Sequence, residues 1–121
     1  MASLINQTKN KTLIEDLNVA RSFKERAQGL IGTKSLTANQ GLWFPSVASS
    51  PSYCWIHTYF MSIPIDVIYL DSDMKVKKLE KNLKPWKFAA PVFGSNSLVE
   101  VAAGFIEKND VQLGDKLHVG N

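Results

Sequence analysis

Cysteine and long apolar runs are the scarcest features of this 121-residue sequence. Its single cysteine, Cys54, cannot form an intramolecular disulfide and cannot supply the paired thiolates of a structural zinc site. No stretch approaches the roughly 20 apolar residues that span a membrane. Residues 1–11 contain no run that resembles a signal peptide, so we expect a cytoplasmic protein without a transmembrane segment.

The sequence also lacks the short motifs that mark the common enzyme classes. It contains no phosphate-binding glycine-rich loop, no dinucleotide-binding fingerprint and no nucleophile elbow. We therefore expect no cofactor, and the function has to be argued from individual polar residues.

The composition is that of an ordinary globular protein. Apolar residues make up 45% and charged residues 21% of the chain, which argues against disorder. The length suits one domain and is too short for two. We expect a flexible tail at residues 1–10 and a single β-rich domain at residues 11–121.

Short segments rich in β-branched and aromatic residues predict strands separated by turns. The predicted strands are residues 12–19, 53–60, 63–70, 98–101 and 116–119. Residues 71–73 predict a turn. Residues 75–83 are ambiguous, because their apolar spacing fits a helix whereas their place after the turn fits a hairpin partner.

One helix is predicted at residues 22–32. Ser22 and Glu25 have the spacing of a capping box, and glycines at 29 and 32 suit the end of a helix. The predicted fold is therefore α+β and mostly β, an antiparallel β-sandwich or barrel-like core with one short N-terminal helix. We assign structural roles to Arg21, Ser22, Glu25, Arg26, Gly29, Gly104, Gly114 and Asp115.

The net charge of +3 arises largely from one lysine-rich stretch around Trp86. Its lysines are Lys75, Lys77, Lys78, Lys81, Lys84 and Lys87. One interpretation is a surface for anions or nucleic acid with Trp86 as a stacking platform. The other is a solvated hairpin in which lysine guards an edge strand against aggregation. We favour the second, because neither arginine nor a nucleic-acid motif accompanies the lysines, and we expect no nucleic-acid partner.

The segment from Cys54 to Asp66 carries unusual chemistry for a predicted strand. Cys54, His57 and Met61 could form part of a copper site, but such sites need a second imidazole, and the other histidine, His118, is near the C-terminus. Side chains alternate between the faces of a strand, so the Cys54 thiol and His57 ring would point apart. The same geometry argues against a nucleophile–base pair.

Two carboxylates, Asp66 and Glu100, sit inside apolar strand segments, where a charge is costly unless it is paired or hydrogen-bonded. They could converge with His57 on a cleft and have shifted pKa values. They could equally pair with Arg21 or Arg26, or accept backbone amides. Both interpretations stay open.

The sequence resembles the prokaryotic family known as domain of unknown function 192. The matching pieces are Ala20-Arg21, Glu25-Arg26-Ala27-Gln28-Gly29-Leu30, Gly41-Leu42-Trp43-Phe44, His57-Thr58-Tyr59-Phe60-Met61, Pro64-Ile65-Asp66-Val67-Ile68-Tyr69-Leu70-Asp71, Leu83-Lys84-Pro85-Trp86, Leu98-Val99-Glu100-Val101-Ala102-Ala103-Gly104 and Gly114-Asp115-Lys116-Leu117. The chain departs from the family at Ser72-Asp73-Met74, where a glycine turn is usual.

This resemblance implies a small β-rich fold with an accessory helix, and it implies a strand at residues 75–83. It implies no reaction. It also groups the polar and aromatic candidates into one shared site, which consists of His57, Thr58, Met61, Asp66, Trp86 and Glu100.

Three functional hypotheses follow from these residues. The preferred one is a non-catalytic binding or accessory domain with a polar and aromatic cleft for a small ligand or a protein partner. The second is a hydrolase that uses Asp66 and Glu100 with His57, which requires the two carboxyl groups to flank one bond. The third is a copper protein that uses Cys54, His57 and Met61.

Overall fold

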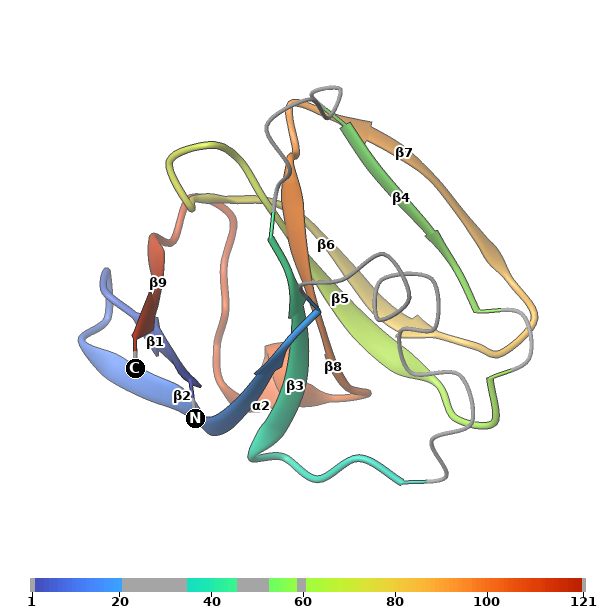
Figure 1. Ribbon diagram of the computed structural model, residues 1–121, viewed down its shortest axis with the longest axis horizontal. Helices are drawn as coiled ribbons and strands as arrows, with labels where there is room; N and C mark the ends of the chain where they lie inside the picture. Colours follow the sequence, from blue (N-terminus) through green and yellow to red (C-terminus); the bar gives the residue numbers. More distant parts are fainter. Residues whose placement is uncertain (1, 21–34, 46–52, 59–60, 121) are drawn as a thin grey trace.

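The computed structural model describes residues 2–20, 35–45, 53–58 and 61–120, and for residues 53–57, 88–91 and 93 it describes the backbone alone. These residues form nine strands and one short helix (Figure 1). In chain order the elements are β1 (Ala2–Asn6), β2 (Lys11–Val19), β3 (Gln40–Phe44), β4 (Tyr53–His57), β5 (Ile65–Leu70), β6 (Val76–Leu83), β7 (Phe88–Phe93), β8 (Ser97–Ala102), α2 (Phe105–Lys108) and β9 (Leu117–Gly120). Within these ranges no helix is long and apolar enough to cross a membrane.

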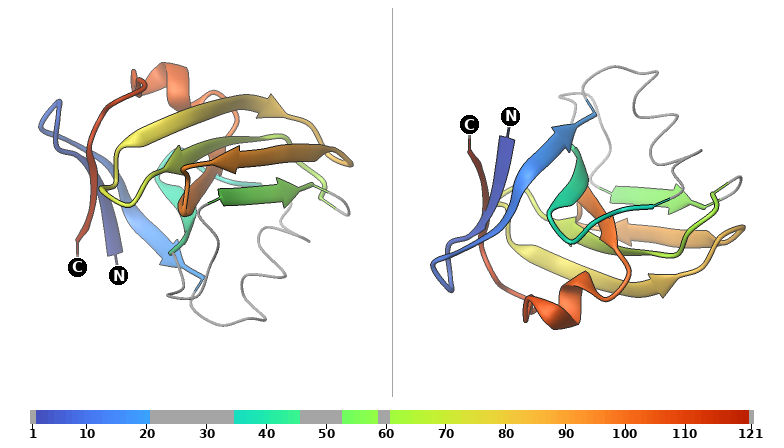
Figure 2. Two further views of the ribbon diagram at one scale, coloured as in Figure 1. Left: turned by 90° about the horizontal axis from the view of Figure 1, so that it is seen from above. Right: turned by 90° about the horizontal axis from the view of Figure 1, so that it is seen from below.

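Seven strands form one curled sheet in the order β6-β5-β8-β3-β2-β1-β9, and β4 pairs with β7 in a separate two-stranded sheet (Figures 1 and 2). The described pairs are antiparallel except β2 with β3, which run parallel. A bridge between Lys75 and Lys116 joins the beginning of β6 to the residue before β9. The curled sheet is therefore a half-barrel whose two edge strands meet at one end.

The mostly β fold is confirmed and the core is barrel-like, whereas a sandwich is not confirmed. The predicted helix at residues 22–32 lies outside the described residues. The described helix, α2, follows β8 near the C-terminus instead, and Gly104 before it has a φ of 91°. A four-residue helix is too short to leave a periodic pattern, and so the sequence did not predict it.

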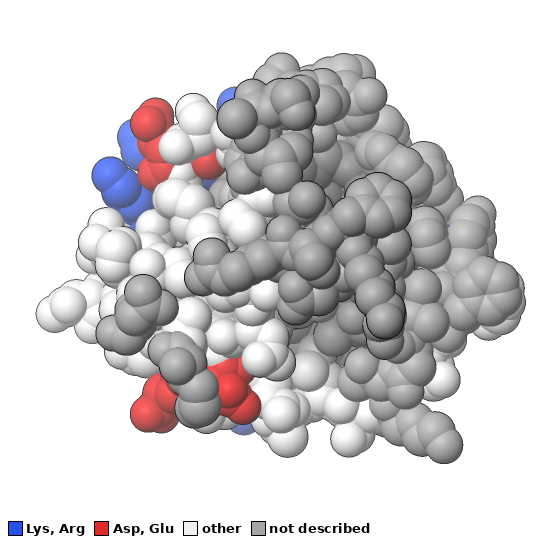
Figure 3. Space-filling view, viewed as in Figure 1, with Lys and Arg blue, Asp and Glu red and all other residues white. Residues whose placement is uncertain are grey.

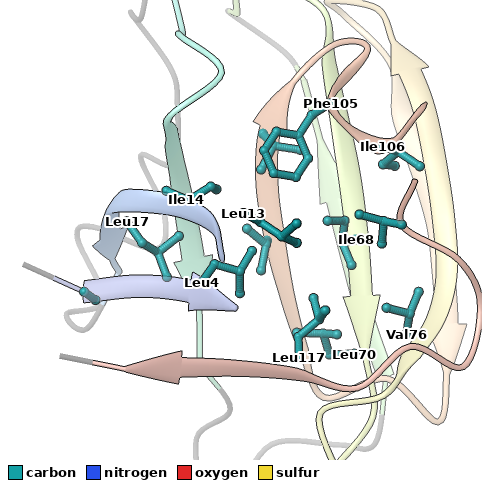
Figure 4. Close-up of a cluster of buried hydrophobic side chains, with 14 residues drawn as sticks. Leu4, Leu13, Ile14, Leu17, Ile68, Leu70, Val76, Phe105, Ile106 and Leu117 are labelled. Carbon is teal, nitrogen blue, oxygen red and sulfur yellow. The ribbon is translucent and has the colours of Figure 1, made fainter. Parts of the chain in front are cut away.

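Strand β5 separates two hydrophobic cores, and all six of its residues are buried. Because side chains alternate along a strand, Ile68 and Leu70 face the first core, and Ile65, Val67 and Tyr69 face the second. The first core lies inside the curl of the sheet and is covered by Phe105 and Ile106 of α2 (Figure 4). A strand buried on both faces reads as a continuous apolar run, as residues 67–70 do.

The second core lies on the other face of β5 and β8. Met61, Leu98 and Val92 of β7 are buried there, and Leu42 and Phe44 of β3 pack against them. Since Val92 belongs to the two-stranded sheet, that sheet packs on this face of the half-barrel.

The predicted flexible tail at residues 1–10 is wrong, because residues 2–6 form β1. This strand pairs with β2 on one side and β9 on the other. Ala2, Leu4 and Asn6 are buried, whereas Ser3 and Ile5 are half-buried. The stabilising partner β9 comes from the opposite end of the chain, which local sequence patterns cannot reveal.

The ambiguous residues 75–83 form a strand, as the family resemblance implied. Two irregularities in its pairing with β5 explain the misleading spacing. They put Leu79 opposite Ile68 and Leu83 opposite Ile65, on different faces of the sheet. The strand β7 was not predicted at all, because it contains a proline and two alanines, residues that strands disfavour.

Candidate functional site

Glu100 lies in the middle of β8 and faces the second core. Its cross-strand neighbours are Leu42 on β3 and Val67 on β5. On its own strand, Leu98 shares this face, because residues two apart point the same way. The position of the strand in the sheet therefore places a carboxyl group among aliphatic side chains.

One oxygen of the Glu100 carboxyl group is buried without a hydrogen-bond partner in the described part of the chain. The residue is 4% exposed, and this oxygen is its Oε1 atom. Burial raises the pKa of Glu100 from 4.5 to about 8, because the ionised form cannot be solvated there. At neutral pH the side chain is therefore a neutral carboxylic acid, which can both donate and accept a hydrogen bond.

Asp66 lies on the opposite face of the sheet. It pairs with Val101, whereas the adjacent Val67 pairs with Glu100. Its Oδ1 accepts a hydrogen bond from the backbone N–H of Asn82 at 2.8 Å, and its Oδ2 accepts from those of Gly104 and Ile106 at 3.1 and 3.0 Å. Asp66 thus joins β5 to β6 and to the start of α2, and the sheet separates it from Glu100. The predicted pairing of these two carboxylates in a hydrolase is wrong.

Thr58 holds the turn between β6 and β7. Its side chain is fully buried, and its hydroxyl donates to the Lys84 carbonyl at 2.6 Å and accepts from the Lys87 N–H at 2.8 Å. Its backbone N–H donates to the Lys87 carbonyl at 2.7 Å, and its carbonyl accepts from the Trp86 N–H at 2.8 Å. Thr58 is therefore a structural clamp at both ends of residues 84–87.

The six predicted cleft residues do not share one site. Met61 is buried in the second core, on the face that Glu100 shares. Trp86 is 58% exposed at the clamped turn. His57 belongs to β4, opposite Phe88, and only its backbone is described.

The copper hypothesis stays untested by the described side chains. Cys54 and His57 both lie on β4, as the extended stretch predicted, with an irregularity of pairing between Cys54 and Ile56. Their side chains are outside the described part. Among the residues that the structure does describe, no group of three His, Cys, Asp or Glu side chains could hold a metal ion.

Sequence reasoning missed Glu80, the second carboxylate on the face of Glu100. Glu80 pairs with Val67 from the β6 side, and Glu100 pairs with it from the β8 side. Glu80 is half-buried on the edge strand. A regular hairpin that pairs Leu70 with Val76 would place Leu79 opposite Val67, so the irregularity between Tyr69 and Leu70 hides the position of Glu80 from the sequence.

The expected structural residues fall into two groups. Arg21, Ser22, Glu25, Arg26 and Gly29 lie outside the described residues. Gly104 and Gly114 both have a φ near 90°, which favours glycine.

Asp115 is buried and closes a polar network at the base of the half-barrel. Its Oδ2 accepts from the Asn6 side chain at 2.9 Å and from the Gln112 N–H at 3.0 Å, and lies 3.1 Å from the Lys9 ammonium. Burial acts against these contacts, but together they lower the pKa of Asp115 below 3.8. The carboxylate fastens the β1–β2 turn to the loop before β9.

Sequence comparison places the chain among uncharacterised proteins. The profile of the DUF192 family, described as an uncharacterized ACR, matches residues 4–119. The UPF0127 protein of Thermococcus sibiricus is 34% identical over 94% of this chain and 72% of its own length. The UPF0127 protein PH1112 of Pyrococcus horikoshii is 32% identical over 94% of this chain and 96% of its own length.

Two crystal structures share the fold. One is a protein of unknown function from Novosphingobium aromaticivorans, with a TM-score of 0.79 over 97% of this chain and 82% of that one. The other is a putative transcription regulator from Sinorhizobium meliloti, with a TM-score of 0.80 over 98% of this chain and 91% of that one. Each is 20% identical to this chain, so the likeness concerns the fold alone.

Proposed function

The chain belongs to the DUF192 family of uncharacterised proteins, as its resemblance predicted, and we propose that it is a non-catalytic binding domain. Its ligand is a small molecule with an apolar body and one uncharged hydrogen-bonding group. The site is the second core around Glu100, between the half-barrel and the two-stranded sheet.

The observation that carries this proposal is the buried Oε1 atom of Glu100, which has no hydrogen-bond partner among the described residues. Burying a polar group without a hydrogen bond costs of order 1–3 kcal/mol in proteins, so such a group calls for an explanation. A ligand that hydrogen-bonds to the neutral acid removes this cost when it binds. A carboxamide or hydroxyl suits it best, because the neutral acid offers one donor and one acceptor.

The surroundings favour an apolar ligand body. Leu42, Val67 and Leu98 flank Glu100 on its face, and Met61 and Val92 belong to the same core. The part-buried Glu80 lies beyond Val67 on the edge strand, where the solvent-facing end of a ligand would lie. Asp66, which a hydrolase would need beside Glu100, is committed to three backbone amides on the other face.

The test is a binding screen with amides and alcohols of increasing apolar size, from butyramide to benzamide, followed by two-dimensional amide NMR. We expect the shifts to concentrate on β3, β5 and β8. Glu100→Gln keeps a neutral donor and acceptor and should retain affinity. Glu100→Met keeps the volume without either and should bind at least about tenfold more weakly.

The pH dependence gives an independent readout. As pH rises through about 8, Glu100 loses its proton and can no longer donate, so wild-type affinity for amides should fall. Glu100→Gln should show no such fall. Glu80→Gln, the matched control on the same face, keeps Glu100 and should show the same fall as the wild type. The proposal is wrong if no probe binds, or if Glu100→Met binds as well as the wild type.

A further inference from the structure

Strand β6 is an edge strand of the half-barrel in the described part of the chain. It is the last strand of the seven-stranded sheet and pairs with β5 alone among the described strands. Backbone hydrogen bonds from residues 114–117 cover its outer side at residues 74–76. From residue 77 to residue 83, no backbone hydrogen bond to the outer edge is found among the described residues, although the Asn82 N–H already donates to Asp66. The unpaired backbone groups of an edge can pair with another strand, although lysines on the edge oppose strands of like charge.

This edge carries a concentrated positive charge. Residues 75–87 contain six lysines and one glutamate, out of 14 basic and 11 acidic residues in the whole chain. Lys77, Lys78 and Lys81 of β6 are all exposed. Lys81 makes a 3.5 Å ion pair with Glu107, but both groups are largely exposed, so this pair is weak.

The lysine side chains lie on both faces of the sheet along this edge. Lys78 pairs with Tyr69, which faces the second core, whereas Lys81 reaches Glu107 of α2 on the side of the first core. The face drawn in Figure 3 shows a different distribution, since its described surface is largely uncharged, with acidic and basic groups at two margins. The charge of the lysine-rich stretch therefore follows an edge.

Trp86 lies in the turn just beyond the end of β6. The residue is 58% exposed, although it has a φ of 64°, a backbone conformation that costs non-glycine residues of order 1 kcal/mol. The Thr58 clamp holds this turn in place from both sides. Tryptophan is among the residues enriched at the energetically dominant positions of protein interfaces.

We propose that the outer edge of β6 and Trp86 bind an extended acidic peptide segment of a protein partner. The segment adds a strand to the half-barrel, its backbone pairs with residues 77–83, its carboxylates meet the lysines, and an apolar residue packs on Trp86. A polypeptide is favoured over nucleic acid because only another β-strand can pair with the row of backbone N–H and C=O groups along a strand edge. A second copy of this chain is disfavoured, because pairing β6 with itself would place lysines opposite lysines.

The experiment uses a fluorescein-labelled peptide of about ten residues, rich in glutamate and threonine with one leucine near an end. Its binding to the full chain is followed by fluorescence anisotropy at low salt. The combined variant K77Q/K78Q/K81Q and the variant W86A should each weaken binding by about fivefold or more. The single variants K78Q and K11Q give a matched comparison, because each removes one exposed lysine, and K11Q on β2 should change binding by less than about twofold.

Two comparisons separate strand addition from simple charge attraction. A peptide of equal charge with proline at alternate positions lacks the backbone N–H donors along one of its edges and should bind at least about tenfold more weakly. On binding the threonine-containing peptide, amides within residues 77–83 should exchange more slowly with solvent. The inference is overturned if the proline peptide binds equally, if K11Q weakens binding as much as K78Q, or if oligo-dT or anionic vesicles bind more tightly through the same lysines.

Discussion

At the scale of single residues, the most consequential group is a carboxyl that stays protonated at neutral pH. Its pKa is 4.5 in the unfolded chain and about 8 in the folded chain. Between these values the folded protein keeps a proton that the unfolded chain has released. The free energy of unfolding contributed by Glu100 is therefore fully present below pH 4.5 and is lost as pH rises toward 8.

The variant Glu100→Gln should remove this loss. We expect the wild type to lose up to about 1.4 kcal/mol of stability per pH unit relative to the variant between the two pKa values. Urea unfolding of both proteins across that range measures the difference. Glu80→Gln should keep the wild-type slope, and parallel pH profiles of wild type and Glu100→Gln would contradict the assignment.

The sequence could identify Glu100 and Asp66 as unusual, but it could not separate their roles. Each lies between two β-branched residues, so the sequence pattern around the two carboxylates is the same. Which one finds partners depends on Asn82, Gly104 and Ile106, whose backbone amides are brought to Asp66 by a bulged strand and a short helix. Neither of those features leaves a periodic signal.

At the scale of elements, Asp66 fixes the helix α2 to the half-barrel. The variant Asp66→Asn replaces one acceptor oxygen with an NH₂ group that faces backbone donors. We expect a loss of about 1–3 kcal/mol in the free energy of unfolding. Faster hydrogen exchange at Gly104 and Ile106 would show that the loss begins at α2.

A control for this prediction lies in the adjacent turn. Asp71 accepts from the N–H groups of Asp73 and Lys75 at an exposed turn, so Asp71→Asn should cost less than Asp66→Asn. Equal losses for the two variants, or protection at α2 unchanged by Asp66→Asn, would show that Asp66 is not what holds the helix.

Elements with strong local signals were the predictable part of the fold. The strands β2, β4, β5, β8 and β9 and the turn after β5 follow from β-branched residues and turn residues. The turn at Met74 shows where this fails, because Met74 has a φ of 62° and packs against the first core. Packing overrides the local preference for glycine that the resemblance implied at this turn.

At the scale of the whole molecule, the two ends of the chain complete the half-barrel. Deleting residues 1–6 would remove β1 from between β2 and β9, together with Leu4 and the bond from Asn6 to Asp115. We expect this variant to show no cooperative unfolding transition by circular dichroism. Ser3→Ala, which removes only a 3.5 Å contact with Gly120, should change stability by less than about 0.5 kcal/mol. A deletion variant that melts like the wild type would show that β1 is dispensable.

The pairing of β1 with β9 also fixes where anything attached to this protein can sit. Ser3 lies opposite Gly120, and both ends of the chain are far from the turn that bears Trp86 along the longest axis of the molecule (Figures 1 and 2). An affinity tag, a surface tether or a fused fluorescent protein would therefore lie at the same end of the molecule whether it is joined at the N-terminus or the C-terminus. The opposite end, with the turn that bears Trp86, stays accessible when the protein is immobilised through either terminus.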